Sequence, residues 1–500
     1  MNRSLLRGIF WCVAAVCLVA QAVAQSVTVT ILHTNDMHAA FIPHEATWRR
    51  ESPKPLVGGF KELEFTVDSV RKATSNVLLF DAGDVMTGNP ITDRLYKGAE
   101  GGALFEMMNM IGYDAWTIGN HDFDISQENL VALTKIAQFP TLSANIVNTQ
   151  GAFPVNNREY IVLNRFGLRI GVFGLMSQEL YSLVNQNNLV GIKVLSPIET
   201  ARRLIATLDP MTDLIIAVTH QGVEEDSVLA ANVQGLDVII GGHSHTRLTK
   251  PKVVNNVIIV QAGSQCENVG ALEVTVDNDR VVRFSGTLIQ LWARNDRPRT
   301  RLSVFVDSMQ AAIEKDYSEV LAELATDWTR ERGESSIGRF IADAQREAAH
   351  AHVAFMNASG IRANVAAGPL TKRELFEVLP FRNILTTFQL SGRELRSVVL
   401  HTLANDEAVI FSGLYAAVKR MPDNTWKVVT LNVGGKPLED DRMYSCAASD
   451  FMVGQAKKYF GLEIQQPVYL KQTVFEAIER AVRNAKVIAE RTDRRIEVVP

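Results

Sequence analysis

The sequence predicts an α/β fold in two domains, and three observations support this prediction. The chain has 500 residues, of which 47% are hydrophobic and 21% are charged. A single hydrophobic core usually stops growing near ~250–300 residues, so a chain of this length has room for two cores. Residues 27–263 repeat a β-rich apolar run followed by a polar cluster. Around residues 292–335 this pattern gives way to a charged stretch and then a helical pattern.

The first 24 residues differ from the rest of the chain and are predicted to be a secretory signal peptide. Arg3 and Arg7 precede the apolar run IFWCVAAVCLVA, and small residues within positions 22–24 offer a cleavage site. The alternatives are an uncleaved anchor, for which the run is shorter than the ~20 residues needed, and a lipoprotein, for which Val16 is large before Cys17. We expect an exported chain, periplasmic or extracellular, with no stable membrane span.

Net charge and cysteine content narrow the expected partners and cross-links. The formal net charge is −4, from 51 basic and 55 acidic residues, and it becomes −6 (49 minus 55) without the first 24 residues. A mildly acidic chain argues against a nucleic-acid binder, which normally carries a basic face. Cys266 and Cys446 remain after the signal is removed. We expect two free thiols, with one disulfide as the alternative. No pattern predicts an oligomeric state.

Seven apolar runs are predicted to be strands, and a cluster of Asp, Asn, His, Ser, Thr, Gln, Glu or Gly follows each run. Continuous Val, Ile and Leu are typical of fully buried strands, and ligand sites in α/β folds lie beyond the carboxyl ends of such strands. The clusters are therefore expected to converge on one face. Helical stretches alternate with the runs, and one begins at Ser196 with a capping box to Glu199. The runs are SVTVTIL (26–32), NVLLF (76–80), YDAWTI (113–118), LRIGVFGLM (168–176), LIIAV (214–218), LDVII (236–240) and VIIV (257–260).

The second half of the chain is predicted to be an independent α+β domain. A charged stretch, WARNDRPRTR, precedes a helical segment with spaced apolar residues that reaches residue 324. We expect the inter-domain connection here; the alternative is a surface helix of one continuous domain. Residues 335–349 form an amphipathic pattern, and capping boxes open at Thr371 and Ser391. The expected parts are a signal peptide (1–24), a first domain (25–300), a linker helix (301–325) and a second domain (326–500).

The polar clusters contain seven side chains that can bind metal ions through nitrogen or oxygen. They suit borderline to hard divalent ions such as Zn²⁺, Mn²⁺, Co²⁺ or Fe²⁺. Seven ligands are too many for one ion, so we expect two ions that share Asp84. Two ions ~3.5–4 Å apart can polarise a phosphoryl group and activate a bridging water. Each cluster alone is more typical of a solvated turn, so the prediction depends on their order at successive strand ends. The seven are Asp36, His38, Asp84, Asn120, His220, His243 and His245.

The order of these clusters resembles that of the calcineurin-like metallophosphoesterases: Asp-x-His, Gly-Asp, Gly-Asn-His-Asp/Glu, His, then Gly-His-x-His. The residues around each cluster are similar to the motifs of the secreted 5′-nucleotidase family. These segments are LHTNDMHAAF, FDAGD, TIGNHDFD, VTHQG and IIGGHSH. GESSIGRFIADA, NASGIR and VLPF in the second half extend the resemblance over roughly residues 27–465. The resemblance implies a four-layer αββα sandwich metallophosphoesterase domain followed by an α+β substrate-binding domain.

The resemblance also implies roles for single residues of the first domain. His121 lies beside the phosphoryl group in the family, where it can stabilise charge and protonate the leaving oxygen. Asp124 would orient its ring, and Asp122 is expected to support the site. The seven ligands would divide between two ions that share Asp84: Asp36, His38, Asp84 and His245 for one, and Asp84, Asn120, His220 and His243 for the other.

The second domain is where the sequence departs from the family. Arg362 and Asn357 in NASGIR are expected to bind substrate, Arg362 through its phosphate or ribose region. Relatives hold the base between two aromatic rings, for which Phe451 and Phe411 are the candidates; the alternative for Phe411 is a core side chain. Three positions depart from the family pattern, namely Arg339, Ala408 and Lys457.

The sequence therefore predicts an exported dinuclear metal-dependent phosphoesterase. Its expected substrates are nucleoside 5′-monophosphates or related nucleotide phosphate esters, small molecules attacked by a metal-bridging hydroxide. The alternative activities on the same centre are 2′,3′-cyclic nucleotide phosphodiesterase, UDP-sugar hydrolase and thiosulfate-ester hydrolase. A reading from another class is a non-catalytic exported protein that binds a nucleotide or metal. The expected pair of His121 and Asp124 argues against it, because a binder has no use for a leaving-group acid.

Overall fold

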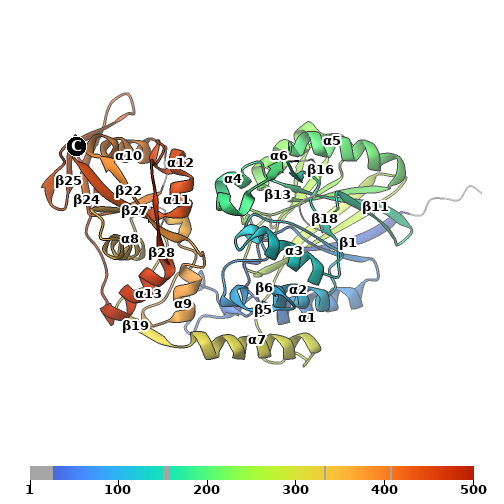
Figure 1. The fold of residues 1–500 in the computed structure, drawn as a ribbon. Helices are drawn as coiled ribbons and strands as arrows, with labels where there is room; N and C mark the ends of the chain where they lie inside the picture. Colours follow the sequence, from blue (N-terminus) through green and yellow to red (C-terminus); the bar gives the residue numbers. More distant parts are fainter. Residues whose placement is uncertain (1–25, 150–157, 332–333, 406–407) are drawn as a thin grey trace, which may run out of the picture.

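The computed structural model describes residues 26–149, 158–331, 334–405 and 408–500, so the expected signal peptide lies outside the described residues. They form two domains joined by helix α7 (Arg301–Tyr317), as Figure 1 shows. The N-terminal domain runs from β1 to β18, and the C-terminal domain runs from β19 to β30. Within the described residues, every helix is too short or too polar to cross a membrane.

The first sheet of the N-terminal domain has six strands in the order β18-β17-β1-β4-β7-β8. Strands β1, β4, β7 and β8 are parallel neighbours, with β8 at one edge, whereas β17 and β18 add antiparallel strands at the other edge. Parallel strands end at the same edge of the sheet, which is where ligand sites form. The strands are β1 (Val27–Thr34), β4 (Val77–Asp81), β7 (Ala115–Thr117), β8 (Thr141–Leu142), β17 (Asn268–Val276) and β18 (Val281–Gln290).

The second sheet also has six strands, in the order β10-β11-β13-β14-β16-β15. Strands β11, β13, β14 and β16 are parallel, and β10 and β15 pair antiparallel at the two edges. All seven apolar runs of the sequence supply strands of these two sheets. The strands are β10 (Tyr160–Arg165), β11 (Leu168–Met176), β13 (Leu214–His220), β14 (Val238–Gly241), β15 (Lys252–Val254) and β16 (Val257–Val260).

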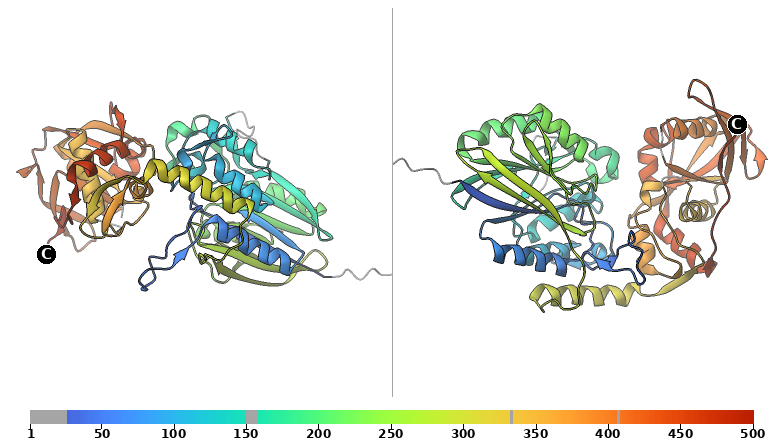
Figure 2. Two further views of the ribbon diagram at one scale, coloured as in Figure 1. Left: turned by 90° about the horizontal axis from the view of Figure 1, so that it is seen from below. Right: turned by 180° about the vertical axis from the view of Figure 1, so that it is seen from behind.

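The two sheets pack face to face between two layers of helices, as Figures 1 and 2 show. In β1, Ile31 lies in the core between the sheets, and the next residue, Leu32, lies in the core under the helices. This alternation is the two-residue period of a strand buried on both faces. The fold confirms the predicted four-layer αββα sandwich. The covering helices are α1 (Phe60–Ala73), α2 (Gly102–Ile111) and α3 (Gln127–Ile136) on the first sheet, and α5 (Pro197–Leu208) and α6 (Val223–Asn232) on the second.

Helix ends follow the predicted capping residues in most places. The side chain of Ser196 accepts a hydrogen bond from the backbone of Glu199 at the start of α5, without the reciprocal bond of a full capping box. Full boxes are present at Thr371 and Ser391, at the starts of α9 and α10. Each satisfies backbone N–H groups that the first helical turn leaves unpaired.

The predicted helical segment after residue 301 is shorter than expected. Helix α7 ends at Tyr317, and residues Val320–Leu324 form strand β19, which pairs with β21 and β29. The helical prediction for residues 320–324 is therefore wrong. Leu321 and Leu324 are buried in the core of the C-terminal domain, and a paired strand satisfies their backbone groups there.

The C-terminal domain is the predicted α+β unit, with a five-stranded sheet β23-β20-β27-β22-β28 and a four-stranded sheet β26-β25-β24-β30. Helix α8 (Ser336–Ala348) confirms the predicted amphipathic helix. The other main helices are α9 (Lys372–Val378), α10 (Gly392–Ala404) and α13 (Val474–Ala485). The strands of the two sheets are β20 (Val353–Asn357), β22 (Ile384–Ser391), β23 (Val409–Ser412), β24 (Leu414–Arg420), β25 (Trp426–Val433), β26 (Lys436–Pro437), β27 (Met443–Ser449), β28 (Val468–Thr473) and β30 (Ile496–Val498).

Shorter elements complete the chain, and Cys266 and Cys446 are both buried free thiols, as predicted. The short helical elements are η1 (Pro90–Asp93), η2 (His121–Phe123), α4 (Leu180–Leu183), η3 (Gln186–Leu189), η4 (Asp209–Met211), η5 (Ala358–Gly360), α11 (Asp450–Gly454) and α12 (Ala456–Phe460). The short strands are β2 (His44–Glu45), β3 (Leu56–Val57), β5 (Leu95–Tyr96), β6 (Ala99–Glu100), β9 (Ile146–Asn148), β12 (Ile192–Val194), β21 (Gly368–Thr371) and β29 (Val487–Ile488).

Candidate active site

The carboxyl ends of five strands bring the predicted metal ligands together. The clusters follow β1, β4 and β7 of the first sheet and β13 and β14 of the second. Six of the seven residues fall into two groups whose ligand atoms lie within 4.8 Å of one another. The first group is Asp36, His38 and His245, and the second is Asp84, His220 and His243.

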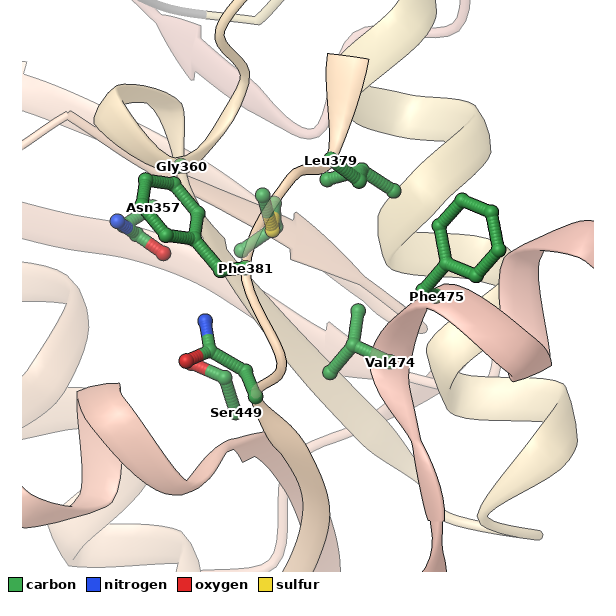
Figure 3. Close-up of a pocket in the computed structure, with 9 residues that line it drawn as sticks. Asn357, Gly360, Leu379, Phe381, Ser449, Val474 and Phe475 are labelled. Carbon is green, nitrogen blue, oxygen red and sulfur yellow. The ribbon is translucent and has the colours of Figure 1, made fainter. Parts of the chain in front are cut away.

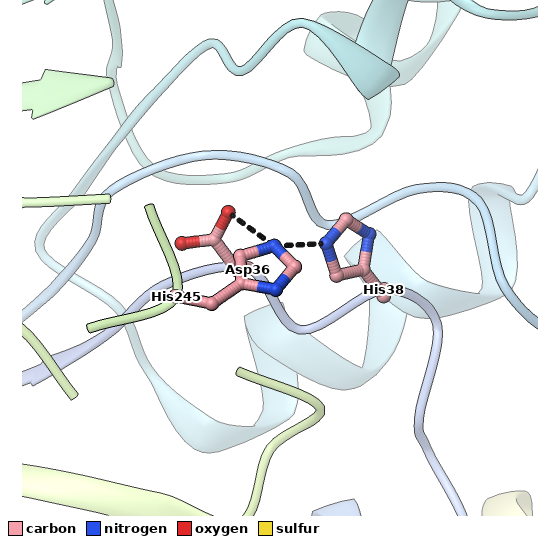
Figure 4. Close-up of side chains that lie close together, drawn as sticks. All are labelled: Asp36, His38 and His245. Atoms are coloured by element: carbon pink, nitrogen blue, oxygen red, sulfur yellow. Dashed lines mark hydrogen bonds and ion pairs between the residues drawn. The ribbon is translucent and has the colours of Figure 1, made fainter. Parts of the chain in front are cut away.

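In the first group, two imidazole nitrogens and one carboxylate point at a common position (Figure 4). Nε2 of His38 lies 2.9 Å from Nε2 of His245, which lies 3.4 Å from Oδ1 of Asp36. Burial and the nearby His245 hold the pKa of His38 well below its ordinary value, so the ring is neutral. Neutral imidazole and carboxylate are the donors that a borderline divalent ion requires, so the residues fit a metal ion.

In the second group, His220 is fixed by its backbone partner. Its Nδ1 donates to the carbonyl of Ala82 at 2.7 Å, which leaves Nε2 facing Oδ2 of Asp84 at 3.2 Å. The side-chain oxygen of Asn120 lies 3.1 Å from the same Nε2. Although burial lowers the pKa of His220, the charge of Asp84 outweighs it and raises the pKa to about 10. Next to this carboxylate, the Nε2 atom of His220 therefore binds a positive charge favourably, either as a proton or as a metal ion.

The loops that carry the ligands are held in unusual backbone conformations. Five ligand residues have left-handed φ angles: Asp36 (50°), His38 (47°), Asp84 (57°), His243 (77°) and His245 (54°). Such angles are uncommon for residues other than glycine and cluster at functional sites. The GNH motif needs its glycine for a different reason, because a Cβ on Gly119 would lie 2.2 Å from the backbone nitrogen of Asp84.

Asp122 connects the loops that carry Asp84 and Asn120. Its carboxylate accepts hydrogen bonds from four backbone N–H groups, those of Gly119 (2.7 Å), Asp84, Val85 and Met86 (3.1 Å each). The side chain is buried, and burial together with the charge of Asp84 raises its pKa to about 7. Asp122 thus binds the backbone around Asp84 and Gly119 with its carboxylate.

His121 and Asp124 form a hydrogen-bonded pair beside the two groups. Nδ1 of His121 lies 2.7 Å from Oδ2 of Asp124, which also accepts from the hydroxyl of Thr87 at 2.7 Å. His121 begins the short helix η2 and Asp124 follows its last residue, so one helical turn brings the two side chains together. Burial lowers the pKa of His121, but the charges of Asp124 and Asp84 outweigh it and raise the pKa above its ordinary value. The ring can therefore hold a proton at neutral pH.

The C-terminal domain places a cation and an aromatic ring opposite this edge. The ring of Phe381 lies 5.6 Å from that of His121, at an interplanar angle of 30°. The Arg362 guanidinium lies 5.8 Å from the centre of the Phe381 ring. Burial lowers the pKa of Arg362. The charges of Asp84, Asp124 and Asp36 raise it, but by less. Arg330 lies behind it and donates to the Arg362 carbonyl at 3.1 Å. Together these side chains form a positive and aromatic face opposite the metal ligands.

A small pocket in the C-terminal domain adjoins this face (Figure 3). Asn357 lies next to Phe381 in the pocket, and its amide nitrogen donates to the hydroxyl of Ser359 at 2.9 Å. The predicted substrate residue Asn357 therefore lines the same space as Phe381. The lining residues are Met356, Asn357, Gly360, Leu379, Phe381, Asn383, Ser449, Val474 and Phe475.

The structure corrects the expected pair of aromatic rings. Phe411 is only 2% exposed and packs 5.7 Å from Phe355 in the core, so it does not line the site. It points inward because β23, which carries it, pairs with β20 over this core. The ring at the site is Phe381, the last residue of VLPF, which sequence reasoning missed. The VLPF motif can be found in the sequence, but nothing in the sequence indicates that Phe381 lies next to His121.

Phe451, Lys457 and Arg339, the other second-domain residues singled out in the sequence, contact neighbours within their own domain. Phe451 is half-buried, 6.1 Å from the ring of Tyr459. Lys457 is exposed and pairs with Glu463 at 2.7 Å, and Arg339 pairs with Glu334 at 3.0 Å. Lys457 and Arg339 therefore have partners of their own.

Comparison with known proteins agrees with this architecture in both domains. A model of the calcineurin-like phosphoesterase family matches residues 29–247, and a model of the 5′-nucleotidase C-terminal domain matches residues 315–462. A 5′-nucleotidase of Vibrio vulnificus is 30% identical over 473 residues, covering 83% of this chain and 82% of that protein. Protein UshA of Escherichia coli is 27% identical and covers 90% and 89%.

Other relatives include a longer protein and two solved structures. The trifunctional nucleotide phosphoesterase YfkN of Bacillus subtilis is 29% identical over 76% of this chain, which spans 28% of that protein's length. The solved 5′-nucleotidase precursor of Thermus thermophilus is 28% identical, with a TM-score of 0.81 over 95% of this chain and 99% of that chain. The sulfate thiohydrolase SoxB of Thermus thermophilus shares the fold (TM-score 0.78 over 94% and 96%) at 17% identity. This chain belongs to the 5′-nucleotidase family and is a metal-dependent phosphoesterase.

Proposed function

We propose that this chain is an exported dinuclear phosphoesterase that releases phosphate from nucleoside 5′-monophosphates or related nucleotide phosphate esters. The observation that carries the proposal is the juxtaposition of two nitrogen- and oxygen-donor groups with the His121–Asp124 pair. A protein that only binds metal has no use for a protonated histidine next to the metal ligands.

Two divalent ions, Zn²⁺, Mn²⁺, Co²⁺ or Fe²⁺, would occupy the two groups. When bound, they would supply charge stabilisation for the phosphoryl oxygens and a nucleophile derived from water at neutral pH. Asp84 would serve both ions, since each of its oxygens can bind one. The ligands of one ion would be Asp36, His38, Asp84 and His245, and those of the other Asp84, Asn120, His220 and His243.

His121 would protonate the leaving oxygen of the substrate. Because its Nδ1 is bonded to Asp124, the proton available for transfer is that on Nε2. The charges of Asp124 and Asp84 raise the pKa of His121 against the effect of burial, which favours the protonated ring that this role requires. A general acid of this kind contributes about 10²–10⁴-fold to the rate.

Arg362 would hold the phosphate, and two rings would hold the base. Phe381 replaces Phe411 in this proposal, with Phe451 as the second ring. Strands β22 and β27 pair antiparallel with Leu385 opposite Ser449, so the segments that carry Phe381 and Phe451 leave neighbouring strand ends. A flat base can stack on such rings, whereas its phosphate is bound by the guanidinium.

A panel of phosphate esters tests this proposal. The protein is loaded with Mn²⁺, Co²⁺ or Zn²⁺ and given AMP, UMP, 2′,3′-cyclic AMP, UDP-glucose and a thiosulfate ester in separate assays. We expect the highest kcat/KM with a nucleoside monophosphate. Hydrolysis of the cyclic nucleotide, the UDP-sugar or the thiosulfate ester alone would assign the same centre to that substrate instead. If none is hydrolysed under any metal, the proposal fails.

Export is proposed from the sequence of residues 1–24. Cleavage after the small residue at position 24 would leave Gln25 as the first residue. Expression in a bacterium that is then separated into cytoplasm, periplasm and medium gives the test. We expect activity outside the cytoplasm and an N-terminus at Gln25; an intact N-terminus in the cytoplasmic fraction contradicts the proposal.

A further inference from the structure

One short segment of the C-terminal domain carries the aromatic ring that faces the metal ligands, and the residue before this segment contacts the backbone of Arg362. Residues 379–383 connect α9 to β22, and within them Phe381 lies against His121. The backbone nitrogen of Arg362 donates to the carbonyl of Val378 at 2.9 Å, at the end of α9. The positions of Phe381 and Arg362 at the site therefore depend on where this segment rests on the N-terminal domain.

Arg382, the next residue, binds the N-terminal domain directly. Its two terminal nitrogens donate to both carboxylate oxygens of Glu100, at 3.0 and 3.1 Å, and one of them also donates to Asp93 at 2.8 Å. Burial lowers the pKa of Arg382, but these two carboxylates outweigh it and raise the pKa. A planar guanidinium that meets a carboxylate with two parallel bonds fixes direction as well as distance.

Glu100 is anchored to the structure that carries His121. Its backbone N–H donates to the side chain of Asn129 at 2.9 Å, and its carbonyl accepts from the same side chain at 3.0 Å. Asn129 lies in α3, the helix that follows the His121–Asp124 segment. The contacts therefore lead from Arg382 through the side chain and backbone of Glu100 and the amide of Asn129 to α3, the helix that follows His121 in the chain.

A weaker contact holds the other end of the segment. Asp450 accepts from the backbone of Ile384 at 2.9 Å and from the side chain of Asn185, in the N-terminal domain, at 2.9 Å. Asn188, close to Asn185 in the chain, donates to the carbonyls of Phe123 and Asp124 at 3.0 and 2.9 Å. The bonds that cross between the domains here come from neutral amides: Asn185 to Asp450, Gln186 to the carbonyl of Gly454 at 3.3 Å, and Gln455 to the carbonyl of Tyr181. At Arg382, in contrast, a charged guanidinium makes three bonds to carboxylates.

We propose that Arg382 is a positioning residue for the phosphoesterase reaction, which holds Phe381 and Arg362 in register with His121 through Asp93 and Glu100. The inference rests on the proposed function for its role in turnover. Its side chain is 45% exposed and those of Asp93 and Glu100 are 30% and 32% exposed, so the pairs contribute little to folding. Displacement of reacting groups by ~1 Å, in contrast, can cost ~10²-fold in rate.

Kinetics and hydrogen exchange on the full chain test the proposal. The variants are Arg382→Ala, Arg382→Lys, Arg382→Glu, and Arg382→Glu combined with Glu100→Arg. Arg396→Ala is the matched control, because Arg396 pairs with Asp440 at 3.1 Å within the C-terminal domain and has a similar exposure of 38%. The substrates are AMP and p-nitrophenyl phosphate with Mn²⁺, and amide exchange is followed in residues 379–384.

We expect Arg382→Ala to raise the KM for AMP about tenfold, with a smaller change for p-nitrophenyl phosphate, which has no base to stack. Exchange in residues 379–384 should accelerate, and the unfolding temperature should stay that of the wild type. Arg382→Lys should recover part of the loss. Arg382→Glu should lose more, and adding Glu100→Arg should recover much of it, because the swap restores the ion pair. A purely structural role would instead lower the unfolding temperature and affect both substrates equally.

The proposal is overturned if Arg382→Ala matches Arg396→Ala in KM and in exchange, or if the charge swap is no better than Arg382→Glu alone. If the wild type hydrolyses neither substrate with Mn²⁺, and no ester of the panel with any of the three metals, the proposed function fails instead. In that case the exchange data on Arg382→Ala and the charge swap still decide whether Arg382 positions the segment.

Discussion

The metal-bearing edge of the N-terminal domain and residues 379–383 of the C-terminal domain face each other across the site, but they are held by different means. Asp36, Asp84 and His220 are buried, and their side chains form hydrogen bonds of 2.7 to 2.9 Å with backbone atoms. The segment opposite is held by half-exposed ion pairs at Arg382 and by one amide at Asn185.

This difference separates two tasks. Metal ligands must keep their geometry within narrow limits, and burial with several hydrogen bonds achieves that. The substrate side must admit and release a ligand, and exposed ion pairs break at low cost. We therefore expect substitutions at the metal edge to abolish turnover, and substitutions opposite it to change KM.

Asp84→Ala should have the largest effect, because it removes the carboxylate that both ions would share. We expect the loss of at least one ion per chain and a fall in kcat of about 10³-fold or more. Metal analysis after gel filtration and phosphate release measure the two effects. Asp423→Ala, on an exposed loop of the C-terminal domain, is the control. Full metal content and turnover in Asp84→Ala would contradict the assignment.

Asp122→Asn should come next, because the Asp122 carboxylate binds the backbone beside Asp84. An amide has one acceptor oxygen where the carboxylate accepts from four backbone N–H groups, so the backbone at Asp84 should shift. Substitution of groups that orient metal ligands typically lowers metal affinity or activity about 10–100-fold. A titration of the metal-free protein with Zn²⁺ measures the affinity. Wild-type affinity would mean that Asp122 does not set the position of Asp84.

Phe381→Ala and Phe411→Ala should behave in opposite ways. Phe381→Ala should raise the KM for AMP about tenfold with little change in stability, because it removes a stacking surface. Phe411→Ala should lower the free energy of unfolding by about 3–5 kcal/mol and leave KM unchanged, because it empties part of a core. Steady-state kinetics and chemical denaturation distinguish them. A KM effect at Phe411 would restore the original sequence-based pair of rings.

Asp226→Asn should have the smallest effect and should depend on pH. Asp226 is fully buried behind His220, and burial raises its pKa to about 7. An acid with a raised pKa stabilises the fold below its unfolded pKa, and this contribution is lost as the pH rises through about 7. Relative to wild type, Asp226→Asn should therefore gain about 2 kcal/mol between about pH 5 and about pH 8. Denaturation at both pH values measures it, and an equal gain for the exposed Asp68→Asn would contradict this cause.

The sequence predicted the metal edge much better than the face opposite it. Parallel strands place their carboxyl ends together, so motifs such as Asp-x-His and Gly-Asn-His identify both the residue and its position. No comparable rule links a loop of one domain to the site of another. The ring of Phe381 lies against His121 across the boundary between the two domains, where contacts such as that of Arg382 with Glu100 join them.

Burial explains the wrong expectations in the second domain. Phe411 lies on β23, where alternate residues point into the core, and nothing in its neighbours marks which face it takes. The strand at Val320–Leu324 continues a helical pattern in sequence, but its partners β21 and β29 come from distant parts of the chain. Long-range pairing overrides local preference in both cases.

His121→Ala, with metal content and turnover measured on the same sample, tests the central claim most directly. His121 lies beside the metal groups without belonging to either, and its partner is Asp124 at 2.7 Å. The account predicts two bound ions per chain, as in the wild type, with kcat for AMP lowered about 10²–10⁴-fold. Unchanged turnover with both ions present would contradict the account, because His121 would then not be the leaving-group acid.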